Sequence, residues 1–167
     1  MKLPYTEEES LAAYRGWKAM CGHHSIAAAT GRPLEDVRTS GVKLCGWMNP
    51  SMISQCLRAL KVSYNKVPVT QTTLQLFETL KQNQGSAVLR VQFLGPWMKG
   101  PAAAQYRRTH YIATGNDRVM DPALDTNVIL DFSTWLAWAH GGYAEVCPGS
   151  CGFTFTHAWH LMHRAEA

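Results

Sequence analysis

The spacing of apolar residues along the chain predicts helices first and strands later. Apolar side chains recur at helical period in residues 50–60, whereas residues 87–93 are almost continuously apolar, as in a buried central strand. Cys56 lies on the apolar stripe of that helix, which predicts a core position. Similar patterns and turn signals predict further helices over residues 6–20, 21–29, 34–38, 74–80 and 134–140, and further strands over residues 62–69, 110–114, 118–121, 128–130 and 153–160. This order is typical of an α+β fold.

Two stretches rich in small residues are expected to interrupt these elements. Residues 95–107 are rich in Gly, Pro and Ala and predict a loop of about a dozen residues, and a loop of that length is often functional. Gly141-Gly142 is expected to end the helix that begins near residue 134.

Length and composition predict one globular domain over residues 1–167. Hydrophobic residues make up 46% of the chain and charged residues 17%, which excludes a disordered protein. No apolar run approaches the roughly 18 residues of a membrane span. The N-terminal residues lack the apolar region of a signal peptide. We therefore expect a cytoplasmic protein that does not bind membranes.

The net charge argues against a nucleic-acid-binding protein, and the cysteine count does not require disulfide bonds. The net charge of +4 is mild, and the densest basic stretch, Lys99 with Arg107-Arg108, is broken by Ala102–Ala104. A nucleic-acid-binding surface usually concentrates its charge more strongly, so we expect no nucleic-acid partner. Five cysteines cannot all pair within one chain, and a reducing compartment requires none to pair.

The first candidate for a catalytic residue is Cys21, which stands directly before a segment expected to be helical that contains the helix-forming run Ile26–Ala29. A thiol at a helix N-terminus lies at the positive end of the macrodipole, which favours the nucleophilic thiolate. The alternative is a buried cysteine that acts as a small hydrophobic residue.

A thiol nucleophile needs a base, and the base needs a group that orients it. Residues 110–121 read as a β-hairpin around a Gly-Asn-Asp turn. If Asn116-Asp117 forms an even-numbered tip, His110 and Asp121 share one face of the hairpin as diagonal neighbours. An odd-numbered tip would place them on opposite faces. His110 is thus a candidate base, with Asp121 to orient it.

Other assignments for these polar residues remain open. His24, three residues after Cys21, would share its helix face, although a side chain on the same helix rarely meets the sulfur well. Asn116 and Asp117 are weaker candidates for the orienting role, because turn chemistry already explains them. His110 can equally be a strand histidine with a backbone partner, and Asp121 a turn residue before proline.

The C-terminal region contains residue types that zinc prefers, namely Cys147, Cys151, His157, His160 and His163. The spacing from Cys151 to His157 is much shorter than in common zinc fingers. Strand alternation also places His157 and His160 on opposite faces. We expect no metal and no other cofactor.

Three motifs together resemble the papain-like cysteine peptidases, and within them the bacteriocin-leader peptidase branch. The first is Cys21-Gly22-His23-His24-Ser25-Ile26-Ala27 at the head of a helix. The second is His110-Tyr111-Ile112-Ala113-Thr114-Gly115, and the third is Met120-Asp121-Pro122. The resemblance covers roughly residues 17–130. It implies a papain-like fold in which N-terminal helices, including the cysteine-bearing helix, pack on a small antiparallel sheet. It also implies Cys21 as nucleophile, His110 as general base and acid, and Asp121 as the orienting residue.

One position departs from the pattern of that family. The family usually places a Gln about six residues before the cysteine, where its side chain helps to hold the oxyanion. Here position 15 is Arg, and no Gln precedes Cys21. Arg15, Lys18 or His23 would have to replace that donor, because one lost oxyanion donor typically costs about a hundred- to a thousandfold in rate.

The expected function is a cysteine-dependent hydrolase that cleaves a peptide or isopeptide bond of a protein or peptide through an acyl-enzyme. The same residues can support deamidation or acyl transfer. The alternative from another class is a weak or inactive relative that binds a protein partner through the same cleft.

Overall fold

The computed structural model describes residues 1–17, 19–40, 46–82 and 84–162. Its centre is a six-stranded antiparallel sheet with the strand order β1-β6-β2-β3-β4-β5. The strands span Tyr64–Pro68 (β1), Ser86–Leu94 (β2), Thr109–Gly115 (β3), Arg118–Met120 (β4), Leu130–Asp131 (β5) and Gly152–Leu161 (β6). The near-continuous apolar run in residues 87–93 forms β2, which lies between β6 and β3, as the sequence predicted. Strand β1 lies at the edge of the sheet, where Pro68 is tolerated.

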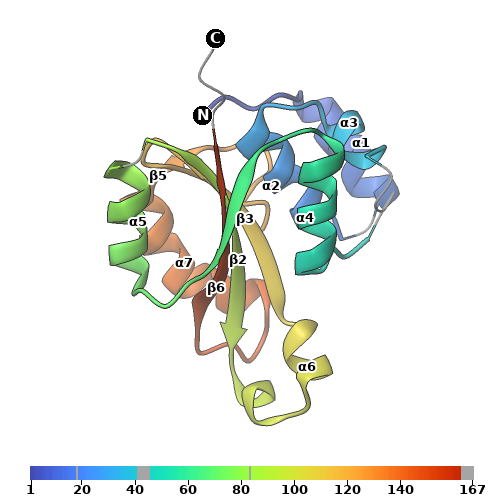
Figure 1. Cartoon of the computed structure of the whole chain (residues 1–167). Helices are drawn as coiled ribbons and strands as arrows, with labels where there is room; N and C mark the ends of the chain where they lie inside the picture. The colour runs from blue at the N-terminus through green and yellow to red at the C-terminus, as the bar shows by residue number, and fades with distance from the viewer. Residues whose placement is uncertain (18, 41–45, 83, 163–167) are drawn as a thin grey trace.

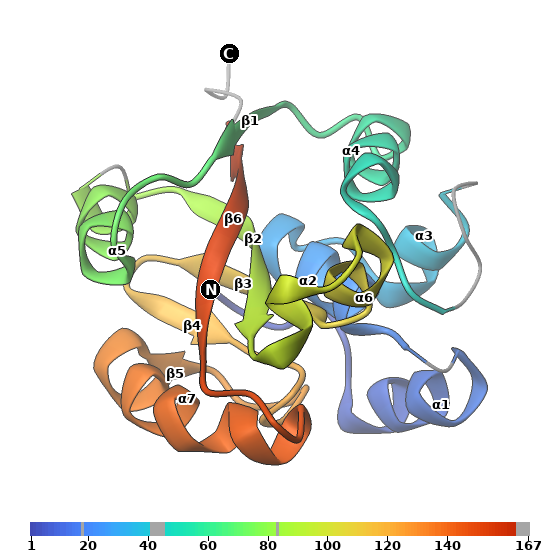
Figure 2. The same cartoon turned by 90° about the horizontal axis from the view of Figure 1, so that it is seen from below.

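Helices cover both faces of the sheet. Figure 1 shows four N-terminal helices on one side, namely α1 (Glu7–Trp17), α2 (Cys21–Thr30), α3 (Leu34–Arg38) and α4 (Pro50–Ala59). On the other side lie α5 (Thr73–Gln82) and α7 (Phe132–Val146). The short helices η1 (Pro96–Lys99) and α6 (Ala102–Tyr106) follow β2, and α6 projects beyond the end of the sheet (Figure 1). In the view from below, α6 lies on the same side of the sheet as α2 (Figure 2). The coarse prediction of an α+β fold is therefore correct.

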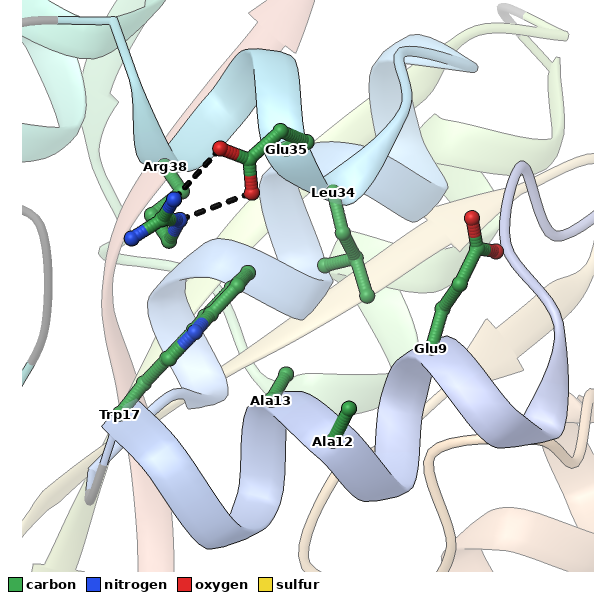
Figure 3. Close-up of a pocket in the computed structure, with 7 residues that line it drawn as sticks. All are labelled: Glu9, Ala12, Ala13, Trp17, Leu34, Glu35 and Arg38. Atoms are coloured by element: carbon green, nitrogen blue, oxygen red, sulfur yellow. Dashed lines mark hydrogen bonds and ion pairs between the residues drawn. The ribbon is translucent and has the colours of Figure 1, made fainter.

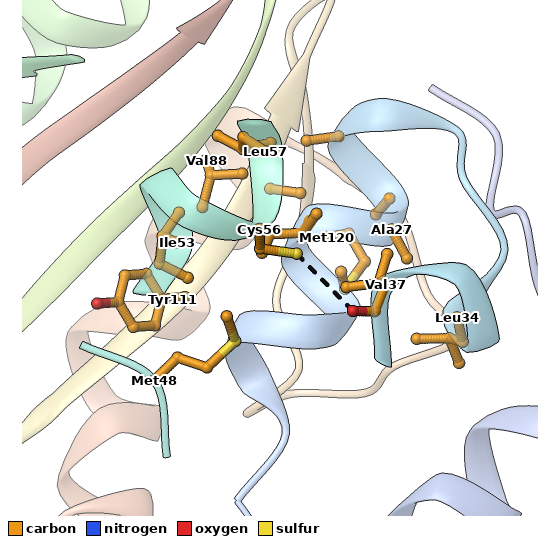
Figure 4. Close-up of a cluster of buried hydrophobic side chains, with 14 of the residues drawn as sticks. Ala27, Leu34, Val37, Met48, Ile53, Cys56, Leu57, Val88, Tyr111 and Met120 are labelled. Atoms are coloured by element: carbon orange, nitrogen blue, oxygen red, sulfur yellow. Dashed lines mark hydrogen bonds between the residues drawn. The ribbon is translucent and has the colours of Figure 1, made fainter. Parts of the chain in front are cut away.

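A separate hydrophobic core fills each side of the sheet. The core under α2 and α4 includes Ile26, Ile53 and Cys56, and all three side chains are fully buried (Figure 4). Cys56 is thus a core residue, as its position on the apolar stripe predicted. The core under α5 and α7 is aromatic and centres on Trp135, which contacts the ring of Phe77. The sheet is held from both faces, so its strand ends provide fixed positions for polar side chains.

Helix α2 is the most deeply buried helix of the N-terminal group. Residues 22–29 are all buried, and Gly31 ends the helix in the left-handed conformation that favours glycine. A Cβ on Gly22 would approach Met48 Sδ to 2.9 Å, so this first turn needs a glycine for close packing. The start of α2, where Cys21 lies, is therefore held tightly against its surroundings.

Three predicted boundaries differ from the structure. The first helix ends at Trp17 instead of Met20, and the stretch 95–107 contains η1 and α6 instead of an irregular loop. Helix α7 continues through Gly141-Gly142 to Val146. The Trp138 ring explains the second glycine, because a Cβ on Gly142 would approach that ring to 2.3 Å. Gly142 therefore allows close packing, a Cβ on Gly141 would meet no atom within 4 Å, and neither glycine stops the helix.

No helix within the described ranges has both the length and the apolar character needed to cross a membrane. Residue 1 and the end of β6 lie at the same end of the sheet in Figure 1, but the view from below separates them (Figure 2).

Candidate active site

Cys21 is the first residue of α2 and is partly exposed. The preceding residue, Met20, is the N-cap, and its side chain makes no capping hydrogen bond. The first helical hydrogen bond runs from the His24 N–H to the Met20 carbonyl, so the backbone N–H groups of residues 21–23 precede the helical ladder. The thiol therefore lies at the positive end of the helix dipole, as the sequence predicted.

The hairpin of β3 and β4 has the even-numbered tip on which the pairing of His110 and Asp121 depends. Thr114 pairs with Val119 and Gly115 with Arg118, which leaves Asn116 and Asp117 as the tip. Both tip residues have positive φ, 51° and 62°, as a two-residue hairpin turn requires.

This register brings the two predicted partners together. His110 Nε2 lies 2.6 Å from Asp121 Oδ1, and both side chains are buried, with 7% and 2% of their surface exposed. Cys21 and His110 line the same pocket, and the charge of each shifts the pKa of the other. Because Nε2 is engaged by Asp121, the other ring nitrogen, Nδ1, is the atom left for the thiol. The structure therefore brings all three predicted residues together, with His110 bonded to Asp121 and next to Cys21.

Helix α7 holds the Asp121 carboxylate from the side opposite Cys21. Asp121 Oδ2 accepts hydrogen bonds from Trp135 Nε1 at 2.8 Å and from the Tyr143 hydroxyl at 2.6 Å. Oδ1 accepts a further bond from the backbone N–H of Ala123 at 2.8 Å. Sequence reasoning missed Trp135 and Tyr143. Their spacing of eight residues places them on one helix face, but nothing local indicates which strand end that face meets.

The charges of Cys21, His110 and Asp121 shift the pKa of each of these three groups. Burial alone would raise the pKa of the Cys21 thiol, but the charge and hydrogen bond of His110 and the backbone N–H groups of Tyr111 and Gly22 hold it below its ordinary value of 9.0. Burial alone would lower the pKa of His110, but the negative charges of Asp121 and Cys21 raise it to about 10. Burial opposes ionisation of Asp121, yet its hydrogen-bond donors keep its pKa below the ordinary value. The arrangement favours a thiolate–imidazolium pair.

A pocket of about 440 Å³ opens beside this pair. Cys21 and His110 line it together with uncharged residues, namely Tyr14, Ala19, Met20, Pro122, Ala123 and Val146. Cys21 and His110 therefore face an open space, with Asp121 buried behind them.

No protein-family model matches the chain, and no curated protein matches it significantly.

The other polar residues near α2 have surroundings of their own. His24 is fully buried, and its ring lies within hydrogen-bond distance of Ser10 Oγ at 3.0 Å and of the Met20 carbonyl at 3.3 Å. His23 is also fully buried and contacts the Trp17 ring edge-on. Arg15 is exposed on α1 and does not line the pocket. Lys18, the third proposed replacement for the oxyanion donor, lies outside the described residues.

The turn residues and the C-terminal residues have separate surroundings. Asp117 contacts Lys81 Nζ at 3.3 Å, so it makes an exposed ion pair at the hairpin tip. Within the described residues, no three His, Cys, Asp or Glu side chains lie close enough together to hold a metal ion. His163 and Cys45 lie outside the described residues. Cys147 and Cys151 are free thiols, the first buried and the second exposed.

A second pocket of about 380 Å³, between α1 and α3, has a different character (Figure 3). Figure 3 shows the Arg38 guanidinium bound by Glu35, and the Arg38 cation lies 5.4 Å from the centre of the Trp17 ring. This pocket is lined by no thiol and no histidine. It therefore does not compete with the pocket at Cys21 as a site for nucleophilic chemistry.

The hydrogen bonds to Asp121 predict the effect of Tyr143→Phe. The substitution keeps the ring but removes one donor to a buried carboxylate, which should lower the free energy of unfolding by about 1.5–3 kcal/mol at neutral pH. The pKa of Asp121 is lower in the folded protein than in the unfolded chain. The stabilisation is therefore fully present at pH values above the pKa of the unfolded chain, and it is lost as the pH falls through the pKa of the folded protein. Urea unfolding at several pH values measures both effects.

Tyr106→Phe is the matched control, because Tyr106 is 46% exposed and lies outside this network. It should change the free energy of unfolding by less than about 0.5 kcal/mol. Equal effects of the two substitutions would show that the Tyr143 hydroxyl contributes nothing to holding Asp121.

Proposed function

We propose that this protein is a cysteine-dependent hydrolase with a papain-like arrangement, which cleaves a peptide or isopeptide bond through an acyl-enzyme on Cys21. The observation that supports this proposal is the placement of Cys21 and His110 together at the wall of an open pocket, with Asp121 hydrogen-bonded to His110 behind them. Each member contributes what nucleophilic catalysis needs, namely a thiolate, a proton carrier and a group that fixes the orientation of that carrier.

The proposed reaction conserves protons in two steps. In the first, the Cys21 thiolate attacks the carbonyl carbon, and the His110 imidazolium donates its Nδ1 proton to the leaving amine as the C–N bond breaks. In the second, neutral His110 takes a proton from water, which attacks the thioester and releases a carboxylic acid. The proton then returns the pair to its thiolate–imidazolium form. Asp121 stays ionised throughout, because three donors besides His110 hold its two oxygens.

The lining of the pocket favours an uncharged group next to the scissile bond. Ala19, Met20, Ala123 and Val146 present apolar surface, and among the described residues no charged side chain lines the pocket apart from the pair itself. A charged side chain entering this space would lose hydration without gaining a partner. The substrate class that fits best is therefore a peptide with small or apolar side chains at the point of cleavage.

Two groups are placed to stabilise the oxyanion in this proposal. The first is the backbone N–H of Cys21, at the start of α2. The second is the phenol of Tyr14, which is the only hydroxyl or amide side chain among the described residues that line the pocket. Tyr14 lies one residue before the position at which the resembling peptidases carry Gln. A phenolic O–H is a neutral donor and suits the role that Gln plays there.

A second function, a protein-binding module, is favoured by a different observation. Tyr14 and Val146 at the pocket are 70% and 45% exposed, which is typical of a surface that contacts another protein. The buried hydrogen bonds to Asp121 argue for the hydrolase, because a surface that only binds has no need of an oriented imidazole.

Acylation by p-nitrophenyl acetate tests the proposed nucleophile and base. We expect rapid release of p-nitrophenol with an acetyl group on Cys21, which mass spectrometry of the digested protein locates. A His110→Gln variant should acylate at least about a hundredfold more slowly, because general acid–base catalysis contributes about that much or more. Digestion of a mixed peptide library then tests cleavage of real amide bonds, with Cys21→Ala as the inactive control.

A Cys151→Ala variant is the matched thiol control, because Cys151 is exposed and lies outside the site. It should acylate and cleave as the wild type does. Acylation of Cys21 without cleavage of any peptide would favour acyl transfer or deamidation instead. Acetyl groups spread equally over all thiols would contradict a catalytic role for Cys21.

Tyr14→Phe tests the proposed oxyanion donor separately from the nucleophile. Loss of the hydroxyl should slow acylation of Cys21 by up to about a hundredfold, because an oxyanion forms in that reaction. Alkylation by iodoacetamide forms no oxyanion, so its rate at Cys21 should stay the same. Equal rates of acylation in Tyr14→Phe and in the wild type would remove Tyr14 from this role.

A further inference from the structure

A buried cation in the centre of the sheet takes no part in the chemistry above. Arg90 lies in the middle of β2 with only 5% of its surface exposed. Within the described part of the chain, the ion pairs are Arg38–Glu35, Lys81–Asp117 and His110–Asp121, and none involves Arg90. A buried guanidinium is costly unless an anion compensates its charge.

The contacts of Arg90 are all with neutral groups. Its Nη1 donates to Thr156 Oγ1 at 2.9 Å, and its guanidinium carbon lies 5.2 Å from the centre of the Tyr106 ring. Its Nε is buried without a hydrogen-bond partner. The charge of Arg90 also opposes the rise in the pKa of the nearby Tyr111 hydroxyl. The Nε–H is therefore the donor of this side chain that no described residue uses.

A β-bulge turns Thr156 towards this cation. Arg90 pairs with His157 and Val91 pairs with Phe155, so Thr156 is the extra residue of the bulge in β6. Thr156 Oγ1 accepts from Arg90 and lies 3.2 Å from Nδ1 of His157. Thr156 thus connects Arg90 to the His157 ring, and the hydroxyl donates to Nδ1 in the tautomer that carries the ring proton on Nε2. A regular strand would not place these two neighbours beside Arg90.

A pocket of about 480 Å³ lies next to this network, on the face of the sheet that α4 covers. It is lined by Trp47, Asn49, Pro50, Ser51, Lys66, Tyr106 and His157. The charged groups at this pocket are cationic or become so on protonation, and no acidic side chain lines it. Burial and the positive charges of Lys66 and Arg90 lower the pKa of His157. Lys66 and Arg90 therefore both act electrostatically on the His157 ring.

We propose that this pocket binds an oxyanion, either a carboxylate or a phosphate group, held by Lys66 and His157 in its wall and by the buried cation of Arg90 beside it. Arg90 supplies a charge that no acidic side chain of the described residues compensates, Lys66 supplies an exposed ammonium, and a ring N–H of His157 supplies a neutral donor. The rings of Tyr106 and Trp47 form an aromatic wall, since their centres lie 6.4 Å apart. None of these residues lines the pocket at Cys21, so this inference does not depend on the proposed hydrolase activity.

An NMR titration of the full chain tests this site with His157 as the reporter. The chain contains seven histidines, and a His157→Gln variant assigns the resonance of interest. Inorganic phosphate and acetate are added in separate titrations, with chloride adjusted to keep the ionic strength constant. We expect a saturable shift of the His157 ring signal with at least one of the two anions, and the anion that binds more tightly identifies the preferred geometry.

Three variants separate a built site from general attraction to a basic protein. Arg90→Gln and Lys66→Gln should each weaken binding by about tenfold or more, because a hydrogen bond to a charged group contributes that much. Arg32→Gln removes the same charge from an exposed position next to the end of α2 and should leave the affinity unchanged. Lys66 is exposed, so its substitution keeps the test valid if Arg90→Gln does not fold.

Two results would overturn the proposal. The first is a His157 signal that shows no saturation with either anion. The second is binding that Lys66→Gln and Arg32→Gln weaken to the same extent, because that would be screening of the overall charge and not a site.

Discussion

The candidate active site depends on one buried carboxylate. Asp121 is almost completely inaccessible to solvent, and a charge in such a position is tolerated only with a full set of hydrogen-bond donors. Those donors come from His110 on the neighbouring strand, from the backbone after Pro122, and from Trp135 and Tyr143 on α7. The same bonds fix the His110 ring, so the orientation of the proposed base is set by the packing of α7.

The position of the sheet between two cores explains why Cys21 and His110 lie next to each other. Helix α2 packs on one core and brings Cys21 to the start of β3, while α7 packs on the other core and holds Asp121. The site thus joins two halves, each of which has its own aromatic or aliphatic core. Its geometry is fixed by rigid elements on both sides of the sheet, which is the condition for preorganised chemistry.

The sequence predicts those parts of this arrangement that depend on local periodicity. The even-numbered tip at Asn116-Asp117 places His110 and Asp121 on one face, and the register confirms this prediction. The roles of Trp135 and Tyr143 were not predictable, because they depend on how α7 docks on the sheet. The continuation of α7 through Gly142 was mispredicted for a similar reason, since the Trp138 ring that needs the glycine is a matter of packing.

The pH dependence of Cys21 alkylation by iodoacetamide tests the central claim most directly. The His110 charge should place the midpoint for Cys21 below the ordinary thiol value of 9.0. In a His110→Gln variant, burial remains and the positive charge is lost, so the midpoint should rise above that value. A midpoint at or above 9.0 in the wild type, or one that His110→Gln leaves unchanged, would contradict the thiolate–imidazolium pair.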